Sequence, residues 1–523
     1  MPTLEWIGKD KVINHHQQVP YRVLEEKYTY NAEKSDNMII RGDNLEALKA
    51  LLPKYEGRIK CIYIDPPYNT GNEGWVYNDN VNDPKIKKWL GETVGKEGED
   101  LSRHDKWLCM MYPRLKLLYR LLHKKDGCIF ISIDENEFAN LKLLCDEIFG
   151  SSQHIATFIW QKRYSRENRE AIGDAHEYIL LYATDTVSFK EQRHLVPMNE
   201  EQAKVYKNPN NDPKGRWRGV PMTAQGFRPN QMYPITDPSG NIHYPPEGRC
   251  WSTLESEYLK LKDEGRIYFG KNNDSQPSVI RYLSEVEGVV PWTWLPSTEV
   301  GHTDAAKKEV YSILGKTNSF DTPKPETLIH YLLSICTNPG DIILDSFAGS
   351  GTTAHAVLNM NKADGGNRKF ILVEMLDYAD SITAERVKRV IDGYGEGNNA
   401  VEGTGGDFTF YDLGQALLLP DGNLNEEVGV EKIREYVWYM ETKTPLAETA
   451  GDNAYYLGCN NNTGYYFFYE KDRITTLGYE FLATIKEKSE SYLIYADLCT
   501  IPDEELKKYN VTFKKIPRDI ARL

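Results

Sequence analysis

The sequence predicts an α/β protein built around a mostly parallel β-sheet. Two segments carry this prediction, because each alternates short apolar strands with a helix. Residues 38–64 contain a strand, a turn, a helix with leucines at helical spacing, and a second strand. Residues 341–374 give the order strand, glycine-rich loop, helix, strand. Strand–helix–strand units of this kind form parallel sheets, so we expect both segments to contribute to one sheet.

Further strands and helices are expected between and beyond these two segments. Apolar spacing predicts helices over 107–122, 140–149 and 328–335, and strands over 128–133, 155–160 and 177–182. The last two strands are close enough in sequence to pair. Residues 71–104 are rich in Gly, Asn, Asp and Lys, and we expect a long loop that covers the site.

Composition limits the class of protein. The chain has 523 residues, of which 40% are hydrophobic and 27% charged, which is ordinary for a soluble protein of several domains. No run of 18 apolar residues occurs, and residues 1–10 lack a secretion signal, so we expect no membrane span. The net charge of −14 argues against a protein that coats nucleic acid, although a local basic groove remains open.

Cysteine and histidine usage indicates a reduced compartment and no metal site. The eight cysteines include no C-x-x-C pair, and several lie in apolar runs. We therefore expect free thiols in a cytoplasmic protein. His15, His16 and His176 could ligate a metal, but no partners stand at a suitable spacing.

Changes in composition along the chain predict five regions. They are an N-terminal extension (1–34), a first α/β half (35–185), an irregular insertion rich in Pro, Asn, Trp and Tyr (186–315), a second α/β half (316–395), and a small C-terminal α+β domain (396–523).

The motif Asp65-Pro66-Pro67-Tyr68 is the leading candidate for an active-site loop. It follows an apolar, β-branched run, and its prolines cannot continue a strand. The loop should therefore lie at the carboxyl end of a strand, where open α/β sheets bind ligands. The Asp65 carboxylate and the Pro66 carbonyl could accept both hydrogens of an exocyclic amine, while the Tyr68 ring offers a face for a stacked base. Proline rigidity would keep these acceptors fixed.

The second candidate is the glycine-rich loop after the strand that ends at Asp345. Gly349 and Gly351 allow the backbone to approach a ligand at a helix N-terminus, and Glu374 is placed to bind ribose hydroxyls. This loop alone fits a nicotinamide or flavin site, a site for another nucleoside cofactor, or a structural turn.

Basic and aromatic residues alternate in two stretches, 160–166 and 216–218. Such alternation suits phosphate pairing and base stacking, and the alternative is a solvated surface with aromatic packing. The candidate DNA contacts are Lys162, Arg163, Arg166, Arg216 and Arg218. For Trp292 and Trp294 we favour core packing over a stacking surface.

Taken together, Asp65-Pro66-Pro67-Tyr68 and Phe347-x-Gly349-x-Gly351 resemble the amino-group DNA methyltransferases that use S-adenosyl-L-methionine. Their order along the chain is similar to the β class of that family. The resemblance implies a Rossmann-like methyltransferase fold with a circularly permuted sheet and a target-recognition domain within 186–315. The layout, including residues 513–519, looks most like the modification subunits of type III restriction systems.

The resemblance also implies roles for individual residues. The catalytic residues would be Asp65, Pro66, Pro67 and Tyr68: Asp65 and the Pro66 carbonyl would bind the N6 hydrogens of an adenine flipped out of double-stranded DNA, and Tyr68 would stack on its ring. Phe347 to Thr353 would cradle the methionine end of the cofactor, Glu374 would bind its ribose, and Asp43 would lie near its adenine. The complete set of expected cofactor-binding residues is Asp43, Asn44, Lys324, Asp345, Phe347, Ala348, Gly349, Ser350, Gly351, Thr352, Thr353 and Glu374.

Expected partners are double-stranded DNA, a second copy of the chain, and a restriction subunit with nuclease and helicase functions. Alternatives are methylation of cytosine N4 or of RNA, and a DNA-binding specificity subunit that directs a partner nuclease. A nicotinamide enzyme is disfavoured, because hydride transfer has no use for two rigid acceptors beside a stacking ring.

Overall fold

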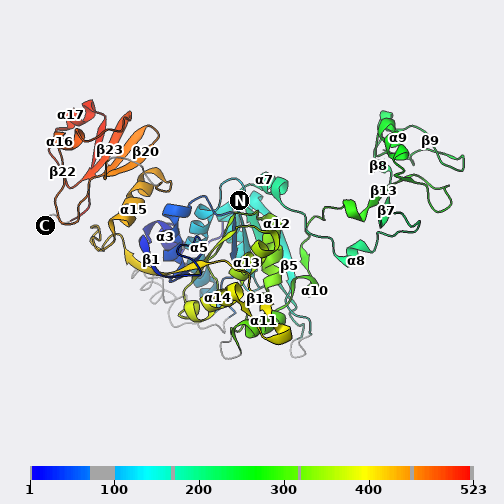
Figure 1. Cartoon of the computed structure of the whole chain (residues 1–523), viewed down its shortest axis with the longest axis horizontal. Coiled ribbons are helices and arrows are strands. Elements are labelled where there is room, and N and C mark those ends of the chain that lie inside the picture. The colour runs from blue at the N-terminus through cyan, green and yellow to red at the C-terminus, as the bar shows by residue number, and fades with distance from the viewer. Residues whose placement is uncertain (1–2, 71–99, 166–170, 316–319, 448–452, 519–523) are drawn as a thin grey trace. The chain divides into compact units, whose positions relative to one another are not determined.

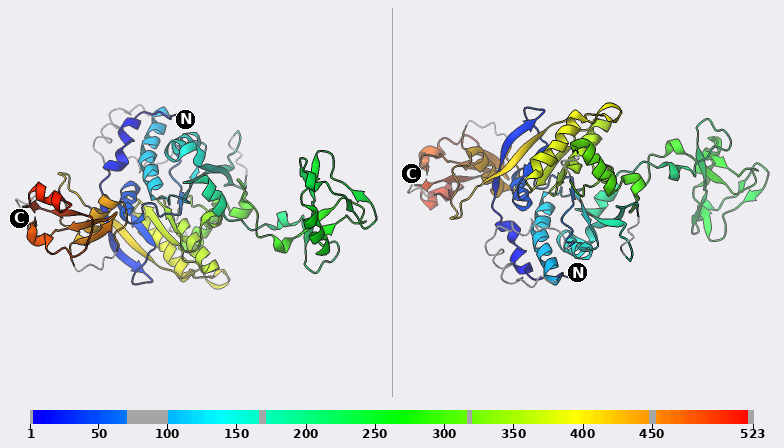
Figure 2. Two further views of the ribbon diagram at one scale, coloured as in Figure 1. Left: turned by 90° about the horizontal axis from the view of Figure 1, so that it is seen from above. Right: turned by 90° about the horizontal axis from the view of Figure 1, so that it is seen from below.

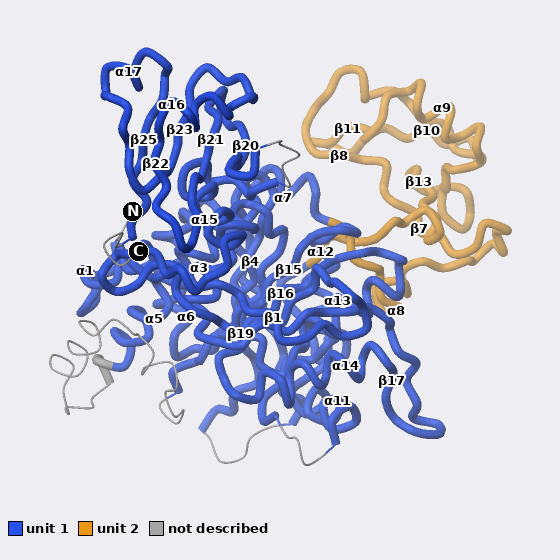
Figure 3. The backbone as a smooth tube through the Cα atoms, turned by 60° about the vertical axis from the view of Figure 1, so that its left-hand side comes forward, with its two compact units in different colours: residues 1–193, 292–523 blue, residues 194–291 orange. Residues whose placement is uncertain are grey.

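The computed structural model describes residues 3–70, 100–165, 171–315, 320–447 and 453–518. The chain forms two compact units (Figure 3). Unit 1 contains residues 1–193 and 292–523, and unit 2 contains residues 194–291.

A ten-stranded sheet forms the centre of unit 1, in the order β1-β19-β2-β16-β15-β3-β4-β6-β5-β14 (Figure 1). Six of its nine neighbouring pairs are parallel, which confirms the predicted mostly parallel α/β sheet. The expected pairing of the strands near 155–160 and 177–182 is also confirmed, as the antiparallel pair β5–β6. The strands are β1 Arg22–Tyr30, β2 Met38–Arg41, β3 Cys61–Ile64, β4 Cys128–Ile133, β5 His154–Gln161, β6 His176–Ala183, β14 Trp294–Leu295, β15 Ile342–Asp345, β16 Lys369–Glu374 and β19 Phe408–Ala416.

Helices cover both faces of this sheet (Figure 2). Ile62 and Ile64 of β3 belong to a core cluster with α3 (Asn44–Tyr55), α5 (Asp100–Leu121) and α6 (Phe138–Cys145). The alternate residue Cys61 points to the opposite face, where it meets Cys336 of α12. The helices of that second group are α11 Thr303–Leu314, α12 Glu326–Cys336, α13 Thr352–Asp364 and α14 Glu385–Asp392.

The parallel pairing of β15 with β3 joins the two halves of the predicted site. Ile343 lies opposite Cys61, and Leu344 lies opposite Ile62. From β15 the chain passes through α13 to β16 on one side, whereas from β3 it passes through α5 to β4 on the other side. The strand order therefore reverses between β15 and β3, which is where open α/β sheets form a ligand-binding crevice.

Both flanks of the α/β core contribute strands to the main sheet. β1 comes from the predicted N-terminal extension, and it pairs with β19 from the predicted C-terminal domain. The boundaries drawn at 34 and 396 therefore do not separate these regions from the sheet, because backbone pairing unites them. Similarly, β14 pairs with β5, so unit 2 ends at 291 rather than at the predicted 315.

Unit 2 contains short strands around small apolar cores. Strand β7 (Trp217–Pro221) pairs with β13 (Ser278–Tyr282), which also pairs with β12 (Ile267–Tyr268). A separate core gathers Met222, Trp251 and Phe269 with the helix α9 (Glu255–Asp263). The other elements are α8 Glu200–Ala203, β8 Thr223–Gln225, β9 Ile235–Thr236, β10 Ile242–His243 and β11 Arg249–Trp251.

The C-terminal region adds a smaller sheet with the strand order β20-β21-β23-β25. Its elements are α15 Val430–Thr442, β20 Tyr456–Asn460, β21 Thr463–Phe467, β23 Ser491–Ala496, α17 Asp503–Lys508 and β25 Val511–Lys515. The predicted strands near 465–469 and 492–496 correspond to β21 and β23. The long loop predicted over 71–104 falls largely outside the described residues, and its last residues belong to α5. Among the described residues, no helix has both the length and the apolar character needed to cross a membrane.

Candidate active site

A cavity of about 420 Å³ lies where several strands of the main sheet end. Asp65 follows β3, Asp345 ends β15, and Glu374 ends β16. Since these strands are parallel, their carboxyl ends meet at one edge of the sheet. Strand β6 runs antiparallel to β4, so Glu177 near its start reaches the same edge. The cavity therefore gathers side chains from both halves of the predicted site.

The Asp65–Tyr68 loop is anchored from α5. The indole Nε1 of Trp107 donates a hydrogen bond of 2.7 Å to the Pro67 carbonyl, and Trp107 is fully buried. The following residue, Asn69, is also buried and has a φ of 61°, which asparagine tolerates better than most residues. These contacts terminate β3 in a fixed conformation. Asp65, Pro66, Pro67 and Tyr68 all line the cavity.

Four charged side chains form a network around Tyr68. The Lys324 ammonium lies 2.6 Å from Asp65 Oδ2, 2.9 Å from the Tyr68 hydroxyl and 3.6 Å from Glu177 Oε2. The Tyr68 hydroxyl is 2.8 Å from Asp65 Oδ1 and 3.0 Å from Glu177 Oε2. Glu177 Oε1 in turn lies 3.3 Å from the Lys162 ammonium. The network joins the ends of β3, β5 and β6 to the start of α12.

The ionised forms of these side chains stabilise one another. Burial lowers the pKa of Lys324, but the carboxylates of Asp65 and Glu177 outweigh it and raise that pKa above its usual value. Burial likewise raises the pKa of Glu177, but Lys324 and Lys162 outweigh it and bring that pKa below its usual value. Lys324 and Glu177 therefore form a charged pair rather than a pair of neutral groups.

The glycine-rich loop is fixed by two carboxylates. Asp345 accepts hydrogen bonds from the Phe347 amide at 3.0 Å and from the Thr353 hydroxyl at 2.5 Å. Glu374 accepts from the Gly349 amide at 2.8 Å. Gly349 has a φ of 51°, and a Cβ there would lie 3.0 Å from the Phe320 ring. Glycine is therefore favoured at this position by both conformation and space.

A buried arginine on a neighbouring helix holds the glycine-rich loop through hydrogen bonds. Arg386 on α14 is fully buried and donates hydrogen bonds of 2.8 Å to the hydroxyls of Ser350 and Thr352. Its charge is balanced by Glu309 at 3.2 Å. Planar, multidentate donation of this kind fixes several loop atoms at once. No sequence pattern points to Arg386, because its partners lie on other elements.

Asp43 and Asn44 do not line the cavity. Asp43 caps α3 by accepting from the Leu45 and Glu46 amides, and it lies 3.2 Å from Arg114. Asn44 is buried, and its side chain links Arg114 to the Ser346 carbonyl. The structure thus gives both residues supporting positions beside the glycine-rich loop. Gly351 is also not one of the residues that line the cavity, whereas the remaining predicted cofactor residues do line it.

The predicted DNA contacts fall in different places. Lys162 and Arg163 line the cavity in unit 1, whereas Arg216 and Arg218 are exposed in unit 2. Arg166 lies outside the described residues.

The tryptophans next to these cations are not exposed stacking surfaces. Trp217 is buried, with its Nε1 2.8 Å from Asn210 Oδ1, and it packs against Tyr268. Trp160 is buried as well. Conversely, Trp292 is 52% and Trp294 is 45% exposed, so the expectation that these two pack in a core is wrong.

Glu177 is the main site residue that the sequence did not reveal. The apolar pattern predicts only a strand over 177–182, with no role for its acid. A signal was present, however, because an acid inside an apolar strand is almost never buried without a partner. Tyr378 and Phe320 also line the cavity unpredicted.

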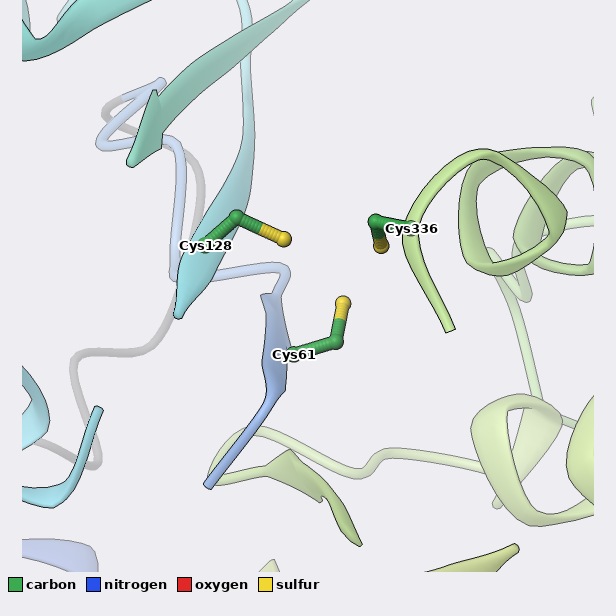
Figure 4. A group of neighbouring side chains, drawn as sticks. All are labelled: Cys61, Cys128 and Cys336. Carbon is green, nitrogen blue, oxygen red and sulfur yellow. The ribbon is translucent and has the colours of Figure 1, made fainter. Parts of the chain in front are cut away.

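Three cysteines meet on the face of the sheet covered by α12 (Figure 4). The sulfur atoms of Cys61, Cys128 and Cys336 all lie within 4.8 Å of one another, and all three residues are buried. Thiolates could hold a thiophilic metal ion. Burial raises the pKa of the Cys61 thiol, which favours its neutral form, whereas hydrogen bonds with Cys336 and Cys61 lower the pKa of the Cys128 thiol to about 5. Cys61 and Cys128 begin their strands, so the cluster lies at the opposite end of β3 from Asp65.

Comparison with known proteins identifies relatives over most of the chain. Residues 59–385 match a family described as DNA methylase. The StyLTI Mod subunit, from a type III restriction-modification enzyme of Salmonella typhimurium (strain LT2), is 36% identical across 74% of this chain and 62% of its own length. The DNA adenine methyltransferase YhdJ of Escherichia coli (strain K12) is 33% identical across 67% of this chain and 86% of its own length.

Among solved structures, the PvuII cytosine-N4-specific DNA methyltransferase aligns with 70% of this chain and 89% of its own. The identity is 12% and the TM-score 0.35. The chain spans less than two thirds of the length of the StyLTI and EcoPI Mod subunits, at 62% and 63%.

The buried Asp345 carboxyl predicts a pH-dependent stability difference. Burial raises its pKa to about 7, so its contribution to stability is complete below about pH 4 and is lost as the pH rises towards 7. Asp345→Asn removes this titration. The free energy of unfolding of the variant relative to wild type should therefore increase by roughly 1–3 kcal/mol between pH 5 and pH 8.

Urea unfolding of both proteins at several pH values measures this difference. Other titrating groups change equally in the two proteins and cancel. A difference that does not vary with pH would show that the pKa of Asp345 lies outside the interval from pH 5 to pH 8.

Proposed function

The chain belongs to the DNA methylase family, and from this premise we propose that it transfers a methyl group from S-adenosyl-L-methionine to the N6 amine of an adenine in double-stranded DNA. One observation carries the proposal. The Asp65–Tyr68 loop and the glycine-rich loop, which lie far apart in sequence, line the same cavity. An amine-binding group thus faces a pocket suited to a nucleoside cofactor.

The cavity suits the cofactor in size and charge. Its volume of about 420 Å³ lies within the range of small-molecule sites. S-adenosyl-L-methionine carries a methyl group on a positively charged sulfur, together with an ammonium group. Burial raises the pKa of both Asp345 and Glu374, so a bound cation would stabilise these carboxylates in their ionised form. Phe347 and Tyr378 add apolar surface.

Asp65, Pro66 and Tyr68 would bind the target base. The base leaves the duplex, because N6 cannot be reached within the stack. Asp65 and the Pro66 carbonyl accept the two N6 hydrogens, and the Tyr68 ring stacks on the base. The nitrogen lone pair forms the new bond to the methyl carbon as the carbon–sulfur bond breaks with its electron pair on sulfur. The surplus proton leaves the nitrogen along its hydrogen bond to Asp65, so no covalent enzyme intermediate is required.

The relatives support a role in restriction and modification. Four of them are named as Mod subunits of type III restriction-modification enzymes, one of these as probable, at 28–36% identity. We therefore propose that the chain is a modification subunit, and that a restriction subunit and a second copy of the chain are its protein partners. All eight cysteines are free, which is consistent with a reducing cytoplasm.

Asp65→Ala tests the catalytic assignment. Methyl transfer should fall by at least about a hundredfold, because the variant lacks the fixed acceptor for the developing charge. Cofactor affinity, measured by calorimetry, should change little. Asp472→Ala removes an exposed acid far along the chain and serves as the control. Transfer by Asp65→Ala at the wild-type rate would rule out this mechanism.

Arg216→Ala combined with Arg218→Ala tests the contribution of unit 2 to DNA binding. If both side chains pair with phosphates, affinity should fall, and the slope of log K against log salt should decrease by about 2. The control is Arg473→Ala with Lys488→Ala, which removes two exposed cations from the C-terminal region. Equal slopes for wild type and the Arg216/Arg218 variant would exclude these contacts.

Mapping modified bases distinguishes the alternatives. The chain is expressed in a host that lacks other DNA methylation, and its DNA and RNA are sequenced for modified bases. N6-methyladenine at one recurring sequence is the expected result. Methylation of cytosine N4 or of RNA would identify the alternative substrates, and an absence of methylation with retained DNA binding would favour a specificity subunit.

A further inference from the structure

The Lys324 ammonium lies where the proposed reaction needs the target amine. Its Nζ is 2.6 Å from Asp65 Oδ2, and its side chain is only 10% exposed. An ammonium and an exocyclic amine both present N–H donors, so they compete for the same carboxylate. We propose that Lys324 occupies the amine site until a base enters, and that Glu177 is the positioning residue that receives the displaced ammonium. This inference rests on the proposed methyl transfer.

Glu177 is placed to receive Lys324 with little movement. Its Oε2 lies 3.6 Å from Lys324 Nζ, while its Oε1 is held by Lys162 at 3.3 Å. A shift of about 1 Å would bring Nζ from this separation to an ordinary charge-assisted hydrogen bond. The Tyr68 hydroxyl contacts both carboxylates, at 2.8 Å and 3.0 Å, and so remains hydrogen-bonded in either arrangement.

The cost of unpaired buried charge explains why such a receiving group is needed. The network contains two ammonium groups, on Lys162 and Lys324, and two carboxylates, on Asp65 and Glu177. If the Lys324 ammonium moved away from Asp65 and no other carboxylate were within reach, a buried cation would be left without a partner. With Glu177 present, Lys324 stays paired while Asp65 binds the amine.

The exchange would also select the entering base. A base that carries an exocyclic amine replaces the Lys324 donor on Asp65, so the carboxylate remains hydrogen-bonded. Thymine has no exocyclic amine, so it cannot offer Asp65 and the Pro66 carbonyl the two hydrogens that would replace the Lys324 donor. Lys324 therefore makes productive entry depend on the functional group that is to be methylated.

A double-mutant cycle tests the exchange. In Glu177→Gln, the displaced ammonium has no second carboxylate, so the single-turnover rate of methyl transfer at saturating cofactor should fall about tenfold or more. In Lys324→Gln no displaced ammonium needs a second carboxylate, so adding Glu177→Gln should change the rate by less than about threefold.

Thermal unfolding and cofactor affinity, measured for each variant, exclude a folding defect. Glu56→Gln is the matched control, because Glu56 pairs with Arg120 at 2.9 Å outside the cavity. It should keep the wild-type rate. If Glu177→Gln lowers the transfer rate by the same factor in the wild-type protein and in Lys324→Gln, the inference is overturned.

Chemical labelling tests occupancy of the amine site without relying on methyl transfer. An amine-reactive reagent is applied to the whole protein, and the labelling rate of each lysine is measured by peptide mass spectrometry. Lys324 should react about tenfold more slowly than the exposed Lys34, and Asp65→Asn should remove much of this protection.

Labelling of Lys324 as fast as that of Lys34 in the wild-type protein would overturn the inference, whatever the transfer assay gives. If Lys324 is labelled slowly and Asp65→Asn removes this protection, Lys324 occupies the amine site. If the same protein methylates no base, the proposed function is rejected although the occupancy is supported.

Discussion

The parallel pairing of β15 with β3 is the contact on which the whole site depends. It brings the carboxyl end of the strand that precedes the glycine-rich loop next to the strand that precedes Asp65. The two helical connections leave this pair in opposite directions, so no crossover helix fills the crevice between them. An amine-binding loop and a cofactor pocket therefore share one cavity, although unit 2 is inserted between them in the sequence.

Buried charge is the second constraint on this edge of the sheet. A carboxylate that stays ionised in a poorly solvated site needs a nearby cation or several hydrogen-bond donors, and the half-buried Asp65 and the buried Glu177 have Lys324 and Lys162 as cations. The same rule applies behind the glycine-rich loop, where Arg386 is balanced by Glu309 and satisfies two loop hydroxyls. Because each ion depends on a partner from another element, these pairs fix the relative positions of α12, α14 and the strand ends.

Prediction from sequence succeeded where local pattern determines structure. The central strands were recognisable as apolar, β-branched runs, and the Asp65 and Gly349 loops were recognisable from proline and glycine constraints. It failed where distant segments decide the outcome. The pairing of β1 with β19, and of β14 with β5, depends on hydrogen bonds between remote strands, so region boundaries drawn from composition were misplaced. The exposure of Trp217 and Trp292 could not be predicted for the same reason. Whether each side chain is buried depends on contacts with distant segments, which the adjacent residues in the sequence do not indicate.

The sequence by itself determined the fold class, the two loops and the chemistry that they suggest, because short-range periodicity and rare motifs encode these features. Only the tertiary structure decided which charges meet. It placed the Lys324 ammonium on the Asp65 carboxylate, gave Glu177 a place in the site, and made Asp43 a helix cap. The physical reason is that a buried ion is defined by partners from other elements, and those partners are set by strand order rather than by neighbours in the chain.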